Sequence, residues 1–163
     1  MKSKVNISVR RFFAILDFQN LRMLKKAIEV IQANVDKPQM SILGKLDNSK
    51  ISLDEIKTNF EQELKDYWNG VLKSKVPFGI FPNAELGTLF IAGNLASQFL
   101  LDISGIPLGS MSAGPYGILR GLGLSEYKVN FHLKLLKEGH FLLLVRDSSM
   151  KLELIEEELE KLS

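Results

Sequence analysis

Apolar and charged stretches alternate along the chain in a way that predicts strands and helices in turn. The run Arg11–Phe18 is bulky and apolar beside charged residues, which favours a strand buried in a sheet. From Leu21 to Ile31 apolar side chains recur every three or four residues, the period of a helix with one buried face, and Asn20 is a suitable N-cap. Ser41–Leu46 is a second apolar run. Residues 11–46 therefore predict a β-α-β unit whose two strands are parallel neighbours.

The next segment predicts a turn followed by an amphipathic helix. Asp47–Lys50 has the composition of a turn, and Ser52 and Glu55 have the spacing of a capping box. Behind them one helical face is apolar, formed by Leu53, Ile56, Phe60, Leu64 and Trp68. We expect Asn69 and Gly70 to end this helix.

Further elements follow from turn residues and apolar runs nearer the end of the chain. Serine residues precede two amphipathic segments, and a glycine separates the first of these from an apolar run. The predicted elements are extended segments at Val76–Phe81 and Gly87–Ala92, in a candidate hairpin about Pro82 and Asn83, a helix from Ser125 to Glu138 ended by Gly139, a buried strand at His140–Arg146, and a last helix opened by Ser148 or Ser149.

Between residues 86 and 124 the chain is apolar and rich in small residues, with Asp102 and Arg120 as its charges beyond Leu86. Small residues recur at four-residue intervals, at Gly105, Gly109, Ala113, Gly117 and Gly121. On a continuous helix they would share one face and let another backbone approach closely, which favours a helix–helix contact within the chain or between subunits. Loops between short helices and a membrane hairpin are the alternatives. Pro107 and Pro115 argue against the hairpin, because a spanning helix needs about 20 apolar residues.

These elements predict one α+β domain over residues 1–163. The order β-α-β, an insertion, and then helix, strand and helix suggests a ferredoxin-like sandwich with an inserted helical, glycine-rich arm and a C-terminal helix. Its expected parts are a mobile tail at 1–10, the β-α-β unit at 11–46, an amphipathic helix and the glycine-rich apolar arm at 47–124, and the helix, strand and C-terminal helix at 125–163.

Composition narrows the classes of function. With 45% hydrophobic and 25% charged residues, the chain is globular rather than disordered. A formal net charge of +2 argues against a nucleic-acid partner. The absence of cysteine excludes disulfides, thiolate catalysis and cysteine-ligated zinc. The apolar run Phe12–Leu16 is too short for a signal-peptide core, so we expect a cytoplasmic, bacterial-type protein.

No motif in the chain predicts a catalytic, cofactor or metal site. His132 and His140 lack a second histidine at ligand spacing, which favours structural or surface roles. Ser104, Ser110 and Ser112 lie among glycines without the G-x-S-x-G pattern of a nucleophile. Neither a dinucleotide-binding glycine motif nor a P-loop occurs. We therefore expect a protein that is not an enzyme and holds no cofactor.

Two pairs of residues have a functional and a structural interpretation. Arg120 and Asp102, the charges of the apolar stretch, could form an anion or ligand site, but an internal salt bridge between two helices of the arm is favoured. Tyr67 and Trp68 could stack on a ligand, but anchoring a core is the commoner use of such side chains.

Three segments resemble a known group of proteins. They are Phe81–Gly93, Gly114–Tyr127 and Leu136–Asp147, and they are similar to the small bacterial general-stress or heat-induced proteins and to glycine-rich relatives of unknown function, often labelled membrane proteins. Here Ser125 stands where many relatives have proline, and Leu101–Ser104 interrupts a run that is usually longer. The resemblance implies a stress-associated bacterial protein and supplies no catalytic residues.

Two function hypotheses follow. The first is a non-enzymatic, self-associating stress protein, a homo-oligomer without a nucleic-acid partner, whose association or ligand region comprises Gly105, Gly109, Ala113, Gly117, Gly121, Arg120 and Asp102. Contact with a membrane surface is not expected, although an apolar face left uncovered on a monomer would allow it. The second is a small-molecule-binding regulatory domain, because Arg120 lies near Tyr116, Tyr127 and glycine-rich backbone that can bind anions.

Overall fold

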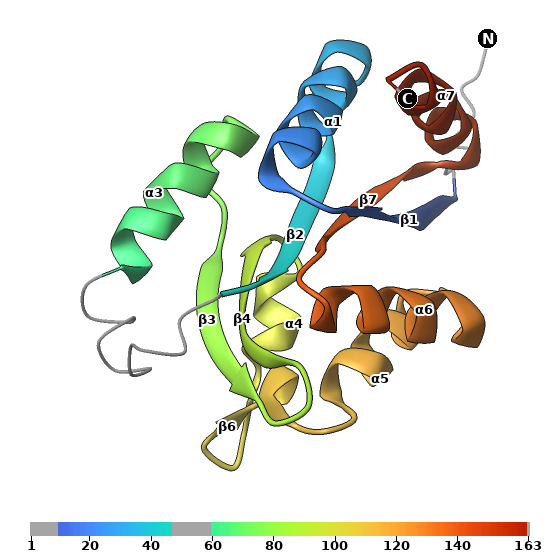
Figure 1. The fold of residues 1–163 in the computed structure, drawn as a ribbon. Helices are drawn as coiled ribbons and strands as arrows, with labels where there is room; N and C mark the ends of the chain where they lie inside the picture. Colours follow the sequence, from blue (N-terminus) through green and yellow to red (C-terminus); the bar gives the residue numbers. More distant parts are fainter. Residues whose placement is uncertain (1–9, 47–59, 163) are drawn as a thin grey trace, which may run out of the picture.

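The computed structural model describes residues 10–46 and 60–162 (Figure 1). Most of the predicted tail, the turn at 47–50 and the capping box of Ser52 and Glu55 lie outside the described residues. The main sheet is antiparallel, with the order β1-β7-β2-β4-β3, and its strands are β1 (Arg11–Phe18), β2 (Gln39–Lys45), β3 (Phe78–Asn83), β4 (Gly87–Gly93) and β7 (Phe141–Ser148). The described helices are α1 (Leu21–Asn34), α3 (Glu61–Leu72), α4 (Ala96–Phe99), α5 (Gly114–Gly121), α6 (Glu126–Lys137), α7 (Ser149–Glu160) and the short 3-10 helix η1 (Leu108–Ser110).

The last strand of the chain lies inside the sheet, between the first two. β7 pairs antiparallel with both β1 and β2, so that Leu16 lies opposite Leu143, and Leu43 opposite Leu142. The predicted β-α-β unit therefore has parallel strands, but the prediction that they are neighbours is wrong. The physical reason is burial: the run Leu142–Val145 is buried on both faces of the sheet, and a strand of that kind belongs at the centre.

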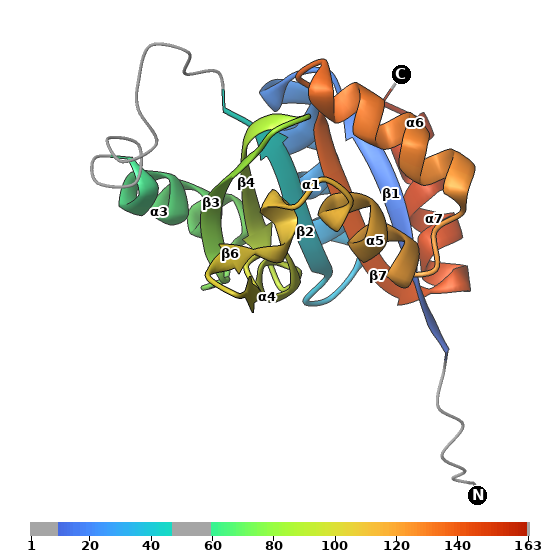
Figure 2. The ribbon, with the colours of Figure 1, turned by 90° about the horizontal axis from the view of Figure 1, so that it is seen from below.

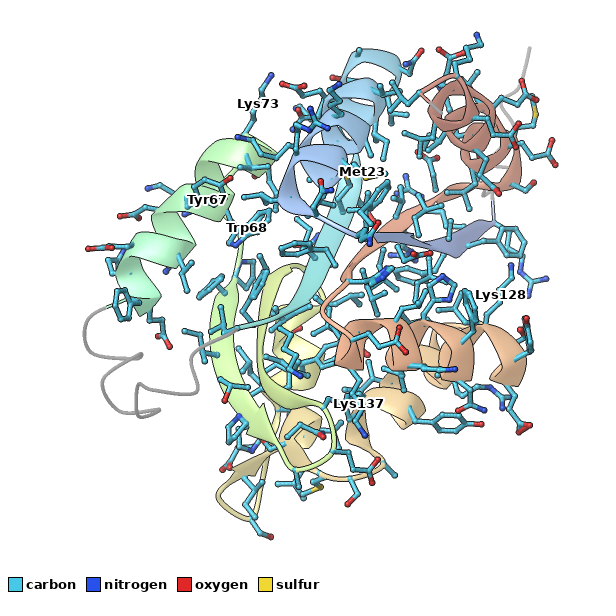
Figure 3. All side chains as sticks on the ribbon, in the orientation of Figure 1. Met23, Tyr67, Trp68, Lys73, Lys128 and Lys137 are labelled. Atoms are coloured by element: carbon cyan, nitrogen blue, oxygen red, sulfur yellow. The ribbon has the colours of Figure 1, made fainter. Side chains whose placement is uncertain are left out.

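Helices cover both faces of the sheet, which makes three layers rather than a two-layer sandwich (Figure 2). On one face lie α1, α3 and α7. Trp68 of α3 is 3% exposed there and stacks on Phe90 with ring centroids 5.3 Å apart, which confirms its role as a core anchor. Its neighbour Tyr67 lies at the surface of the same helix (Figure 3).

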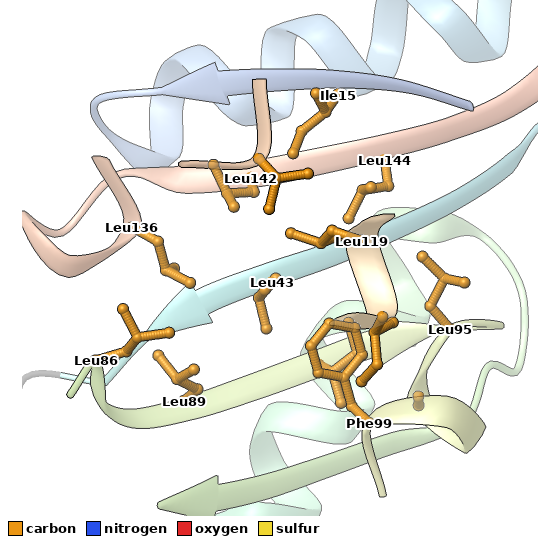
Figure 4. Close-up of a cluster of buried hydrophobic side chains, with 14 of the residues drawn as sticks. Ile15, Leu43, Leu86, Leu89, Leu95, Phe99, Leu119, Leu136, Leu142 and Leu144 are labelled. Carbon is orange, nitrogen blue, oxygen red and sulfur yellow. The ribbon is translucent and has the colours of Figure 1, made fainter. Parts of the chain in front are cut away.

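The opposite face of the sheet carries α4, α5 and α6 (Figure 4). The two faces are supplied by alternate residues of the same strands, as the pleat requires. In β7, Leu142 and Leu144 point toward this second layer, whereas Leu143 and Val145 point toward the first. Two separate apolar clusters therefore share one sheet.

Within the predicted arm, the described residues 60–124 are not helical throughout. The segments 78–83 and 87–93 form the expected hairpin, but its turn is at 84–86 rather than at Pro82 and Asn83, and the hairpin extends the main sheet as β3 and β4. A second small hairpin pairs β5 (Asp102–Ile103) with β6 (Ile106–Pro107). Strands form here because consecutive residues such as Ile80 and Phe81 are buried on opposite faces, which a surface helix cannot achieve. Within the described chain, no helix is long and apolar enough to cross a membrane.

Local signals for helix ends are mostly confirmed. Asn20 and Ser125 each accept a hydrogen bond from the backbone N–H three residues on, at 3.0 and 3.2 Å. Gly139 follows α6 with a φ of 101°, the left-handed conformation that suits glycine. The prediction for α3 is wrong, because the helix runs through Gly70 and ends where Lys73 takes the left-handed conformation, with a φ of 55°.

Candidate functional site

The small residues of the four-residue series do not share a helical face. They lie on three different elements: Gly105 in the turn between β5 and β6, Gly109 in η1, Ala113 at the N-cap of α5, and Gly117 and Gly121 within α5. A Cβ added at Gly109 would come within 2.7 Å of the Phe81 ring, whereas at the other three glycines it would meet open space. The interpretation as one helix-packing stripe is therefore wrong.

Arg120 and Asp102 are not brought together either. Arg120 Nη1 donates to the Tyr116 hydroxyl at 3.1 Å and lies 3.9 Å from Glu126 Oε2. Asp102 is exposed on β5. The predicted salt bridge is wrong, because the stretch that carries these charges is a hairpin and a short helix rather than two packed helices. Arg120 avoids the cost of burial by remaining at the surface, with its side chain 44% exposed.

Both histidines of the chain lie against one carboxylate, that of Asp17 on β1. His140 Nδ1 is 3.1 Å from Asp17 Oδ2, and His132 Nε2 is 3.8 Å from Oδ1. His132 Nδ1 must donate to the carbonyl of Lys128, 2.7 Å away, because a carbonyl only accepts. The described residues contain no group of three side chains arranged to hold a metal ion. The contacts of the two histidines with Asp17 join β1 to α6 and to the start of β7.

A groove between the C-terminal ends of α1 and α3 has the features of a binding site. Its volume is about 810 Å³, and its lining includes Gln32 of α1, the chain after each helix, and Asn94. A neighbouring hollow of about 350 Å³ shares Gln32 and Lys73 with the groove and adds Tyr67 of α3. Figure 3 shows Tyr67 on α3 and Lys73 directly after this helix, beside α1. The two hollows together flank the junction of the two helices.

The groove exists because both helices end in tight turns at the same place. After α1 the chain turns at Lys37, and after α3 it turns at Lys73, each with a left-handed φ, 49° and 55°. Non-glycine residues adopt this conformation rarely, so both turns are held by their surroundings. Asn69 Oδ1 accepts a hydrogen bond from the backbone N–H of Val76 at 2.9 Å, which fixes the second turn.

Gln32 carries an acceptor without a partner at this junction. Its Nε2 donates to the backbone carbonyl of Val71 at 3.0 Å, which links α1 to α3 and fixes the orientation of the amide. The other amide atom, Oε1, is buried and has no hydrogen-bond partner among the described residues. An unsatisfied buried acceptor costs about 1–3 kcal/mol, so a side-chain shift that lets an N–H or O–H group of a bound molecule reach Oε1 would be favoured.

The charge of the groove is positive. Lys37, Lys73 and Lys75 line it, against one carboxylate, that of Asp36. Part of this charge offsets the partial negative charge that the carbonyls of two helix C-termini carry. The remaining lining combines apolar side chains such as Val35 and Met40 with polar residues such as Gln39 and Asn94. This combination suits a small organic anion.

Sequence reasoning did not find this groove, because its polar residues are scattered between positions 32 and 94 and follow no motif. Comparison with known proteins does not supply a site either: the chain matches no protein-family model, no curated protein and no solved structure. The chemistry of the groove is thus the basis for a functional interpretation.

Proposed function

We propose that the protein is a non-enzymatic small-molecule-binding domain and that the groove between α1 and α3 is its ligand site. The buried Oε1 of Gln32, which lacks a donor among the described residues, is the observation that carries this proposal. The proposed ligand is a small organic anion that donates an N–H or O–H group to Gln32 once a small side-chain shift exposes Oε1. Its anionic group would lie near Lys37, Lys73 and Lys75.

Thermal unfolding in the presence of AMP, citrate and inorganic phosphate tests the proposal. A ligand that binds the folded state raises the unfolding temperature in a concentration-dependent way. AMP offers an anionic group together with N–H and O–H donors, and citrate offers carboxylates together with a hydroxyl. Inorganic phosphate lacks the organic part of either molecule, so it reports mainly on binding to the lysines. We expect AMP or citrate to stabilise the protein at millimolar concentration more than phosphate does.

Variants then locate the binding. Lys75→Gln and Gln32→Leu each remove one proposed contact, and we expect each to weaken binding about tenfold, which corresponds to about 1.4 kcal/mol. Lys65→Gln is the matched control, because Lys65 is an exposed lysine of α3 that does not line the groove. If none of the three anions stabilises the protein, or if the control weakens binding as much as Lys75→Gln does, the groove is not an anion site.

A ferredoxin-like relationship and a stress-associated, cytoplasmic role in a bacterium are further proposals. The first is supported by β1 and β2, which run parallel on either side of β7, the split β-α-β arrangement. The second is supported only by the resemblance described above; the helix, glycine, strand and closing helix over residues 126–160 have the same order. A rise in protein abundance after heat shock of the source cells would be expected on this proposal.

Self-association is the second candidate function. This candidate is supported by the edge strand β1 and not by the glycine series. β1 is rich in apolar residues and, within the described chain, pairs with a strand on one side only. Light scattering during size-exclusion chromatography tests it. A strict monomer at about 100 μM, a concentration at which a weak complex of millimolar stability would begin to be visible, would contradict it.

A further inference from the structure

The two edges of the sheet differ in how they are protected. β3 carries Pro82, which cannot donate to a further strand, and its residues 79–81 are buried. β1 has neither proline nor glycine, six of its eight residues are apolar, and Ile15 is its one buried residue. Unprotected edges of this kind invite pairing with another strand. The exposed Phe12 and the half-buried apolar side chains beside it favour a native strand partner at this edge.

The helix above β1 carries an exposed aromatic pair. On α6, Leu133 packs toward the core, and His132 faces Asp17 of β1. By helical geometry Tyr127 and Phe131 lie on the side of α6 opposite the buried Leu136, so the pair points away from the sheet. They are 76% and 45% exposed, and their rings stack with centroids 6.1 Å apart.

We propose that β1 pairs with β1 of a second copy of this chain, antiparallel and with Ala14 opposite Ala14. The proposal rests on the second candidate function, self-association. A two-fold axis normal to the sheet relates two such strands, so that the α6 face of one copy continues into the α6 face of the other. Residues directly opposite must therefore both be odd-numbered or both even-numbered, which restricts the register to shifts of two residues.

Charge selects one of these registers. With Ala14 on the axis, Arg11 of each copy lies opposite Asp17 of the other, and Phe12 lies opposite Leu16. With Phe13 on the axis, Arg11 would lie opposite Ile15, and with Ile15 on the axis, Asp17 would lie opposite Phe13. Each of those alternatives places a charge against an apolar side chain, whereas the chosen register forms two symmetric pairs of opposite charge.

The pairing would also cover apolar surface. On the face that α1 and α7 cover, Phe12, 39% exposed, gains Leu16 of the second copy as a neighbour. The two sheets would form one continuous antiparallel sheet, with β3 and its proline at each end.

Disulfide cross-linking tests both the partner and the register, without background, because the chain contains no cysteine. Ala14→Cys places two thiols directly opposite, with Cα atoms about 4.5–5.5 Å apart, within disulfide range. Leu16→Cys is the matched control on the same strand and the same face. Its counterpart lies four residues along the partner strand, roughly 13 Å away, beyond the range of about 7 Å.

We expect Ala14→Cys to form a covalent dimer under mild oxidation, visible on a non-reducing gel, and Leu16→Cys to remain monomeric on the same gel. In light scattering, we expect Arg11→Glu to raise the dimer dissociation constant at least tenfold, because the introduced carboxylate would face Asp17 of the second copy. Arg22→Glu, an exposed change on α1, is the control and should leave dimerisation unchanged. Circular dichroism verifies that each variant is folded.

Failure of the register and failure of self-association give different results. A wild-type monomer with no cross-link in either cysteine variant overturns both. A wild-type dimer in which Leu16→Cys cross-links as well as Ala14→Cys overturns the register while self-association stands. A dimer that survives Arg11→Glu but is lost in Ile106→Asp, on the tip of the β5–β6 hairpin, overturns the proposed strand pairing and places the contact at that hairpin.

Discussion

At Gly114 two backbone segments approach each other closely on the α5 face of the sheet. Gly114 is the first residue of α5, and a Cβ added there would overlap the carbonyl oxygen of Leu108. That carbonyl cannot retreat easily. Leu108 donates to the Leu101 carbonyl at 2.8 Å and accepts from Met111 at 3.1 Å, so that a shift would break one of these hydrogen bonds. We therefore expect Gly114→Ala to be strongly destabilising.

The magnitude follows from overpacking and is sharpened by a control within the same helix. Forcing an extra carbon into a packed site costs about 1–3 kcal/mol and more where the neighbour is backbone. A Cβ at Gly117 meets open space, and alanine there should gain about 0.5–1 kcal/mol over glycine in a helix interior. The unfolding free energies of Gly114→Ala and Gly117→Ala should therefore differ by about 2–4 kcal/mol.

Urea unfolding monitored by the fluorescence of the single tryptophan measures both variants. Trp68 is buried against Phe90, so its emission reports loss of the fold, and neither glycine contacts it. Equal slopes of unfolding free energy against urea are required for the comparison. If Gly114→Ala is as stable as the wild type, or if Gly117→Ala is the less stable of the two, the packing argument is refuted.

Three further predictions concern other parts of the fold. Asn83 is buried, donates to the Gly109 carbonyl at 3.0 Å and accepts from two backbone N–H groups. Asn83→Ala should therefore lower the free energy of unfolding in urea by about 2–3 kcal/mol, and a loss below about 0.5 kcal/mol would contradict this. Trp68→Ala should cost about 3–5 kcal/mol by circular dichroism, because it empties a stacked core position, and an unchanged midpoint would exclude that role. The hydrogen bond to Glu158, with the charge of that carboxylate, raises the pKa of Lys161 above 10.5. Glu158→Gln should lower the pKa of Lys161 in an NMR titration, and Glu160→Gln should not. The contact of Lys161 with Glu158 stabilises the folded state at pH values below the ordinary lysine pKa, and this stabilisation is lost as the pH rises through the raised pKa.

What could be predicted from the sequence was the local structure. Caps such as Asn20 and Ser125 act within one helical turn, so the residues that form the bond are neighbours in the sequence. The apolar stripe of α1 was equally visible, because its burial needs only a partner surface of any kind. The neighbour of β1 in the sheet could not be predicted, because the apolar run at 141–148, which forms β7, could have paired with any strand of similar burial.

The candidate site could not be predicted, for a related reason. The partnerless acceptor of Gln32 arises only when α1 and α3 lie side by side and Val71 occupies the other end of the amide. The contact of Asp17 with His140 joins residues 123 positions apart, beyond any spacing rule. The glycine series misled because a four-residue interval predicts a helical face only if a helix is continuous. Here Pro107 lies in a strand, and Pro115 lies in the first turn of a new helix.

The position of β7 also bears on how the chain folds as it is made. β1 and β2 are finished by residue 45, but the strand that joins them begins at residue 141. At about 5–20 residues per second, synthesis of the intervening stretch takes roughly 5–20 seconds. Through that interval the inner edges of β1 and β2 lack their native neighbour, while α1 already links them. The nascent chain is therefore most open to wrong strand pairing, or most in need of a chaperone, before Phe141 leaves the ribosome.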